Sequence, residues 1–222
     1  MPHRLRVKFC GVTTAVDAVT AASLGADAIG LNFYERSKRY LTPEAARPIL
    51  RELPPFVEPV AIYVGRPLRE VFQGLGALGR VRTFQWYISP RELHDCHPFL
   101  MIAAFPVKDR ADLTEITRYL DAARAVGRSP AAVLVDAYVP GQHGGTGRTS
   151  PWPLLAEFRP PEPLILAGGL TPENVAEAIA RVRPYAVDVA SGVESAPGRK
   201  DAEKMRRFIG NAREAAVKLP SV

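Results

Sequence analysis

Short apolar runs alternate with segments of helical periodicity from one end of the chain to the other. The first run, Arg6–Cys10, ends at Gly11, and the last, Ala186–Ala190, precedes a helical pattern over Asp201–Val217. Apolar runs without polar alternation are typical of strands in a parallel sheet that is covered on both faces. Strict strand–helix repetition favours an α/β fold.

Eight such units are present in 222 residues, which predicts a single-domain (β/α)8 TIM barrel over residues 1–222. The predicted strands are Arg6–Cys10, Ala28–Phe33, Pro59–Val64, Arg82–Tyr87, Leu100–Ala104, Val133–Asp136, Leu164–Ala167 and Ala186–Ala190. The predicted helices are Thr14–Leu24, Pro43 to the Pro54-Pro55 pair, Pro67–Leu78, Pro90–Cys96, Asp109–Val126, Pro151–Phe158, Pro172–Val182 and Asp201–Val217. A doubly wound open sheet is the alternative, but no G-x-G-x-x-G follows the first strand.

The charge balance is mildly basic, with 29 Lys and Arg against 23 Asp and Glu, a formal net charge of +6. The basic residues are scattered, whereas nucleic-acid-binding proteins usually concentrate them on one face with exposed aromatics. We therefore expect a solvated surface and no nucleic-acid partner. Anionic lipid and an anionic metabolite are the other partners that a positive charge balance allows.

Neither a membrane span nor a secretory signal is expected from the sequence. No run approaches the roughly 20 apolar residues of a membrane helix, so no membrane association is expected. The N-terminal residues lack the apolar core of a secretory signal. Two cysteines, Cys10 and Cys96, provide no disulfide framework, which favours a reducing cytoplasm.

Candidate chemistry lies at the strand ends, because active sites of such barrels form at the C-terminal ends of the strands. Cys10 ends the first predicted strand, Asp136 ends the sixth, and Asp188 lies in the eighth. A thiol and a carboxylic acid in one pocket can act as base and acid. Burial of Asp136 would raise its pKa. The alternatives are a small buried cysteine and an aspartate that caps a helix or a turn.

Lys8 is two residues before Cys10, so the two side chains point the same way along a strand. If both face inward, the ammonium favours the thiolate. Alternatively, Lys8 forms an internal ion pair with Asp136 or Asp188.

Glycine-rich segments follow the last three predicted strands. They contain Gly144-Gly145, Gly168-Gly169 and Ser191-Gly192. Glycine allows a ligand to approach backbone N–H groups closely, and the loops after strands seven and eight commonly bind phosphate in such barrels. Simple tight turns are the alternative. The run His94-Asp95-Cys96-His97 fits no standard zinc spacing and is interpreted as surface residues.

Four motifs together resemble the phosphoribosylanthranilate isomerase family of tryptophan biosynthesis. They are Val7-Lys8-Phe9-Cys10-Gly11-Val12-Thr13, Ser37-Lys38-Arg39-Tyr40-Leu41-Thr42-Pro43-Glu44, Leu134-Val135-Asp136 with Gly144-Gly145-Thr146-Gly147, and, similar to the final third of the family, Leu166–Val175 and Val187–Glu194 with Pro197-Gly198 and Lys200-Asp201. The resemblance covers Val7 to about Ile209.

The resemblance implies an Amadori rearrangement of an aminoaldose, without metal or redox cofactor, by a monomer or homodimer. It implies that Asp136 is the general acid, that Cys10 is the base and that Arg39 binds the anthranilate carboxylate. Gln85 and Asp188 would bind other parts of the substrate. The phosphate would lie on Gly144, Gly145, Gly168, Gly169, Ser191 and Gly192.

Three positions depart from the family pattern. Tyr87 and Ile88 replace a histidine and a glycine after the fourth strand, and Ala103 replaces a lysine in the fifth. A tyrosine can still donate a hydrogen bond there. Another sugar-phosphate isomerase of the barrel class and a non-catalytic barrel that binds a phosphate ligand are the alternatives.

Overall fold

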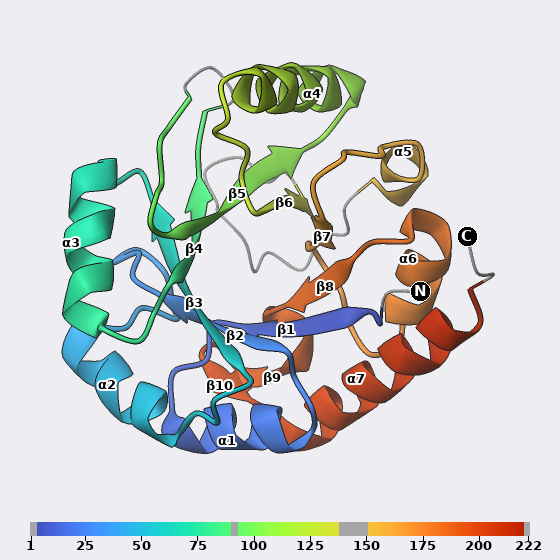
Figure 1. Ribbon diagram of the computed structural model, residues 1–222. Helices are drawn as coiled ribbons and strands as arrows, with labels where there is room; N and C mark the ends of the chain where they lie inside the picture. The colour runs from blue at the N-terminus through green and yellow to red at the C-terminus, as the bar shows by residue number, and fades with distance from the viewer. Residues whose placement is uncertain (1–3, 90–92, 138–150, 220–222) are drawn as a thin grey trace.

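Eight parallel strands close into a barrel in the order of the sequence (Figure 1). The computed structural model describes residues 4–89, 93–137 and 151–219. The barrel strands are β1 (Arg6–Cys10), β2 (Ala28–Asn32), β3 (Glu58–Val64), β4 (Thr83–Tyr87), β5 (Leu100–Val107), β6 (Ala132–Ala137), β7 (Leu164–Leu166) and β8 (Ala186–Val189). The β1–β8 pair closes the barrel, and Lys8 lies opposite Asp188 in its register. The predicted barrel is therefore confirmed.

Helices surround the barrel (Figure 1). They are α1 (Ala15–Ser23), α2 (Pro43–Glu52), α3 (Leu68–Leu78), α4 (Arg110–Ala125), α5 (Trp152–Leu155), α6 (Val175–Val182) and α7 (Ala202–Val217). The last helix, α7, packs against both α6 and α1, so the ring closes where the barrel does. No helix in the described ranges is long and apolar enough to cross a membrane.

Local signals in the sequence account for several helix starts. The Thr14 hydroxyl accepts from the backbone N–H of Asp17 before α1, and Thr42 caps α2, which has Pro43 in its first turn. Asp109 and Asp112 form a reciprocal capping box at α4. Each cap satisfies backbone donors that have no partner within the helix.

Successive side chains of each strand point to opposite faces of the sheet, and this produces two apolar clusters. One side of each strand faces the helices, and the other side fills the barrel interior. The interior cluster consists of small and branched side chains: Val60, Ile102, Ala104, Ala132, Leu134, Ile165, Ala167 and Ala186. Toward the C-terminal ends the interior becomes polar, with Lys8, Gln85, Asp136 and Asp188 all buried. The fold thus places the polar residues at one end of a packed barrel.

The predicted helix Pro90–Cys96 is wrong in its described part, because residues 93–96 are not helical. The Asp95 carboxylate accepts from the backbone N–H of His97 at 3.1 Å, a turn that competes with helix formation. Pro98 also disfavours helical geometry at the residue before it. The same segment contains the run His94–His97, whose spacing fits no standard zinc site. The centroid of the His94 ring lies 4.7 Å from that of Trp86, so this histidine packs against an aromatic side chain.

Three short elements follow β8 and were not predicted. A 3-10 turn (η1, Ser191–Val193) leads into a hairpin of β9 (Glu194–Ala196) and β10 (Arg199–Lys200). These elements lie between β8 and α7, beside the barrel (Figure 1). They add residues to the region where β1 and β8 end.

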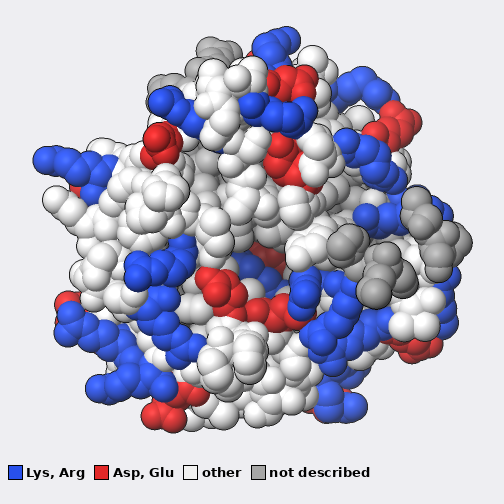
Figure 2. Space-filling view, viewed as in Figure 1, with Lys and Arg blue, Asp and Glu red and all other residues white. Residues whose placement is uncertain are grey.

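Charges of both signs are interleaved on the face of the molecule in Figure 2. Elsewhere in the described residues, surface charges form ion pairs: Arg4 and Arg6 each lie 2.9 Å from the Asp27 carboxylate. The interleaving on this face fits the solvated, mildly basic surface that the composition predicts.

Candidate active site

A pocket opens at the C-terminal ends of the strands, with about 620 Å³ of empty space that includes its mouth. Cys10, Gln85, Asp136 and Asp188 line it together with Tyr87 and Arg39. These residues come from β1, β4, β6, β8 and the segment after β2, so barrel closure brings together positions that are far apart in sequence. Cys10, Arg39, Gln85, Asp136 and Asp188 thus share one cavity, as the sequence predicts.

Lys8 faces the barrel interior on the same side of β1 as Cys10. Its ammonium donates to Asp188 Oδ1 at 2.7 Å and to Gln85 Oε1 at 3.0 Å. Lys8 therefore forms the internal ion pair that the sequence offered as one of two hypotheses, and its partner is Asp188. Burial disfavours the charge on Lys8, but the charges and hydrogen bonds of Asp188 and Cys10 together outweigh the effect of burial, and the pKa of Lys8 is raised.

Cys10 ends β1 and is partly accessible from the pocket. Burial and the Asp188 carboxylate raise the pKa of its thiol above the ordinary value. The positive charges of Lys8, Lys200 and Arg39 act in the opposite direction. The idea that Lys8 favours the thiolate is thus correct in sign, but burial and Asp188 outweigh it in the free protein.

Asp136 lies near the end of β6 and is buried. Its Oδ2 accepts from the Tyr87 hydroxyl at 3.0 Å, and its Oδ1 accepts from the Ala137 N–H at 2.8 Å. Burial raises the pKa of this carboxyl to about 6, although both hydrogen bonds favour the charged form. The predicted desolvation of Asp136 is confirmed. The carboxyl holds a proton at a pH where most aspartates have lost theirs.

Tyr87 therefore takes part in the site at the position where the family pattern has histidine. Tyr87→Phe removes a donor that stabilises the charged carboxylate, so we expect the pKa of Asp136 to rise by about one pH unit above its present value. Carbon-13 NMR titration of the aspartate carboxyls measures this, with Asp136→Asn to assign the signal. Tyr119→Phe is the matched control, because the Tyr119 hydroxyl is buried on α4 outside the pocket. An unchanged or lowered pKa in Tyr87→Phe would contradict the assignment.

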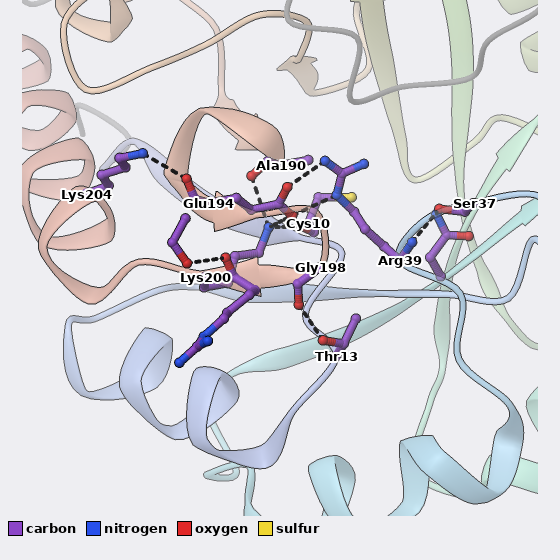
Figure 3. A network of polar contacts seen from close by, with 12 residues as sticks. Cys10, Thr13, Ser37, Arg39, Ala190, Glu194, Gly198, Lys200 and Lys204 are labelled. Carbon is purple, nitrogen blue, oxygen red and sulfur yellow. Dashed lines mark hydrogen bonds and ion pairs between the residues drawn. The ribbon is translucent and has the colours of Figure 1, made fainter.

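Arg39 follows β2, and its side chain is only 11% exposed. Nε donates to Glu194 Oε1 at 2.7 Å, and Nη2 donates to Glu194 Oε2 at 2.6 Å (Figure 3). The Ser37 hydroxyl accepts from the Arg39 N–H and from Asn32 Nδ2, which fixes this segment. One edge of the guanidinium fork is thus already occupied by a carboxylate within the protein, whereas no other residue of the described ranges bonds to Nη1.

The loops after β7 and β8 meet beside the pocket, and Gly168, Gly169 and Ser191 line it. Gly168 and Gly169 have φ of 87° and 62°, a conformation that favours glycine. A Cβ on Gly192 would lie 1.9 Å from the carbonyl oxygen of Leu170, so only glycine permits this approach of the two loops. The other two predicted phosphate-site residues, Gly144 and Gly145, lie outside the described residues.

The three departures from the family pattern differ in their consequences. Ala103 is buried in the outer cluster between strands and helices, so the missing lysine does not alter the pocket. Ile88 packs against the same cluster. Of the three, only Tyr87 lines the pocket.

The sequence analysis assigns no role to four residues that the structure connects to the site. Glu194 and Lys200 are buried side by side in the hairpin, and Glu194 holds Arg39. Both stand in the final motif of the chain, so the signal was present, but their partners are distant in sequence. Asn32 and Ser37 were also missed.

Comparisons with known proteins agree with this geometry. The family profile described as N-(5'-phosphoribosyl)anthranilate (PRA) isomerase matches residues 7–211. The N-(5'-phosphoribosyl)anthranilate isomerase of Geobacter sulfurreducens is 45% identical over 210 residues, which are 94% of this chain and 98% of that protein.

Solved structures give the same result. The phosphoribosylanthranilate isomerase of Thermotoga maritima superposes with a TM-score of 0.82 at 36% identity, over 95% of this chain and 99% of that one. A phosphoribosylanthranilate isomerase in complex with reduced 1-(o-carboxyphenylamino)-1-deoxyribulose 5-phosphate has a TM-score of 0.77 at 35% identity, with the same coverage. The chain therefore belongs to the N-(5'-phosphoribosyl)anthranilate isomerase family.

Proposed function

We propose that this protein converts N-(5'-phosphoribosyl)anthranilate into 1-(2-carboxyphenylamino)-1-deoxyribulose 5-phosphate, the Amadori rearrangement of tryptophan biosynthesis. The observation that carries the proposal is that Cys10 and the buried carboxyl of Asp136, whose pKa is raised to about 6, line one pocket. Family membership narrows the substrate, since a relative of known structure binds a reduced form of this product.

The reaction needs only proton transfers. Asp136 gives its proton to the ring oxygen of the ribosyl group, the bond from that oxygen to C1 breaks, and a Schiff base forms. The Cys10 thiolate then removes the proton from C2, which yields an enolamine. Tautomerisation of the enolamine to the ketone completes the isomerisation, so no atom is gained or lost.

The acid, Asp136, has a lower pKa than the base, Cys10, which is the reverse of the order that would favour the reactive form. The acid has a pKa of about 6, whereas the pKa of the thiol is raised above its ordinary value. The reactive form, with Asp136 protonated and Cys10 ionised, is thus a minor form of the free protein. It nevertheless has the same number of protons as the major form, so the rate follows a bell-shaped pH profile with its lower limb near pH 6.

Substrate binding uses the groups around this pair. The Nη1–Nη2 edge of Arg39 would bind the anthranilate carboxylate, for which a planar pair of donors is suited. Asp188, held by Lys8, would accept hydrogen bonds from the ribose hydroxyls near Gln85. The phosphate would lie on backbone N–H groups of Gly168, Gly169, Ser191 and Gly192, with Gly144 and Gly145 on the loop after β6.

We also infer a cytoplasmic location, because Cys10 has to stay reduced for this chemistry and both cysteines are free thiols. The expected assembly is a monomer or a homodimer, which sedimentation equilibrium measures.

The experiment that tests the function follows the fluorescence of freshly made phosphoribosylanthranilate. We expect its enzyme-dependent loss with saturation kinetics, and a product of unchanged mass that is identified by its ketone. Binding without turnover would support the non-catalytic barrel instead. Turnover of a different sugar-phosphate aminoaldose, with none of phosphoribosylanthranilate, would support another isomerase of the barrel class.

A further inference from the structure

Lys200 is buried beneath the site but does not line the pocket. It lies in β10, its side chain is 0% exposed, and its ammonium makes three contacts (Figure 3). It donates to the Cys10 carbonyl at 2.6 Å, to the Ala190 carbonyl at 3.0 Å and to Glu194 Oε1 at 3.0 Å. All three donors of the ammonium thus have a partner.

The two carbonyls belong to the ends of the strands that close the barrel. The β1–β8 ladder pairs Phe9 with Val189 as its last register, one residue before Cys10 and Ala190. Beyond Phe9 and Val189 the β1–β8 pairing ends, so the carbonyls of Cys10 and Ala190 need hydrogen-bond donors from outside this ladder. Lys200 supplies them, so it continues the connection between β1 and β8 at the level of the thiol.

Glu194 extends this contact to Arg39. Its Oε1 accepts from both Lys200 and Arg39 Nε, and its Oε2 accepts from Arg39 Nη2. The three charged side chains are nearly buried, so each depends on the others for compensation. An unbroken series of charge-assisted hydrogen bonds therefore runs from the Cys10 backbone to the guanidinium that lines the pocket (Figure 3).

We propose that Lys200 is a positioning residue for the isomerase reaction, which holds the Cys10 end of β1 against β8 and, through Glu194, fixes the guanidinium of Arg39. The catalytic part of this proposal rests on the proposed function of Cys10 and Arg39. Its geometric part rests on the contacts of Lys200 alone.

The charge of Lys200 also acts on the thiol. The titratable and charged groups around Cys10 are Lys8, Arg39, Tyr87, Asp136, Asp188 and Lys200, with Glu194 behind Arg39. Asp188 raises the pKa of the thiol, whereas Lys8, Lys200 and Arg39 lower it. Removal of the Lys200 charge should therefore leave less thiolate at a given pH.

Lys200→Met tests the proposal, because it keeps the length of the apolar stem and removes the charge. Lys204→Met is the matched control: Lys204 donates at 2.8 Å to the backbone carbonyl of Glu194 and, among the described residues, contacts neither Cys10 nor Arg39. Both variants are made in a Cys96→Ala background, so that iodoacetamide reports on Cys10 alone. Circular dichroism and thermal unfolding verify the fold.

We expect the pH midpoint of Cys10 alkylation to rise by about one unit in Lys200→Met and to stay unchanged in Lys204→Met. The KM for phosphoribosylanthranilate should rise about tenfold in Lys200→Met, because Arg39 loses part of its support. Equal alkylation midpoints and equal KM values in the two folded variants would overturn the proposal.

Glu194→Gln keeps the test decisive if Lys200→Met fails to fold. Loss of the Glu194 charge leaves Lys200 and Arg39 uncompensated, so we expect the alkylation midpoint of Cys10 to fall. An unchanged midpoint would overturn the link between this cluster and the thiol. Alkylation is measured on the free protein and does not depend on turnover. If the protein fails to turn over phosphoribosylanthranilate, the proposed function is refuted, whereas the alkylation midpoints still test the link between Lys200 and Cys10.

Discussion

Cys10→Ala is expected to lower kcat for phosphoribosylanthranilate by about 10²–10⁴-fold, the usual contribution of a general base. Alanine leaves the backbone contacts of this position intact, including the Cys10 carbonyl that accepts from Lys200. The loss should therefore appear in kcat, while the KM changes little, because the Arg39 guanidinium and the phosphate loops stay in place. Steady-state fluorescence kinetics measure both constants.

Cys96→Ala is the control for this substitution. Cys96 is the other cysteine of the chain, partly buried beside Met101 and outside the pocket. The Cys96→Ala variant should retain the activity of the unmodified protein and remain sensitive to iodoacetamide. If Cys10→Ala, with the fold preserved, keeps a kcat near that of the unmodified protein, the thiol is not the base.

Asp136→Asn is expected to lower kcat by a similar factor of about 10²–10⁴, because an amide has no acidic proton to give to the ring oxygen. The limb of the pH–rate profile near pH 6 should also change. Since the phosphate of the substrate titrates near pH 6 as well, the carboxyl is best measured in the free protein by NMR. Activity close to that of the unmodified protein would remove Asp136 from the role of acid.

The same substitution has an expected effect on stability, in the opposite direction to its effect on activity. The pKa of Asp136 is raised from 3.8 to about 6 in the folded protein, so the folded state binds this proton more tightly than the unfolded state. Ionisation then costs stability, and the cost grows as the pH rises from about 4 to about 6 and stays constant above.

Two pH units correspond to a free energy on the order of 3 kcal/mol. Asp136→Asn, which carries no charge to bury, should therefore unfold at a higher denaturant concentration than the unmodified protein at pH 8. At pH 4 the difference should be small. Urea unfolding at the two pH values measures this, and a variant that is less stable at pH 8 would show that the amide loses more in hydrogen bonds than it gains in desolvation.

Much of the fold was predictable because its signals are local. The periodicity of apolar residues gives the type of each element, and Thr14, Thr42 and Asp109 mark helix starts within a few residues. The helix predicted over Pro90–Cys96 failed in its described part, where a side-chain turn at Asp95 replaces helical hydrogen bonds. The β9–β10 hairpin was missed, since two strands of three and two residues carry almost no periodic signal.

The sequence by itself determined the barrel and the residues at its strand ends, because strand–helix alternation brings Cys10, Asp136 and Asp188 to one rim. Only the tertiary structure decided how these groups are paired. Lys8 bonds Asp188 from 180 positions away, and Arg39 bonds Glu194 from 155 positions away. Hydrogen bonding and charge interaction depend on distances between atoms, and desolvation depends on surrounding packing. No local pattern encodes these quantities, so the raised pKa of Asp136 and the position of Lys200 beneath Cys10 follow from the fold.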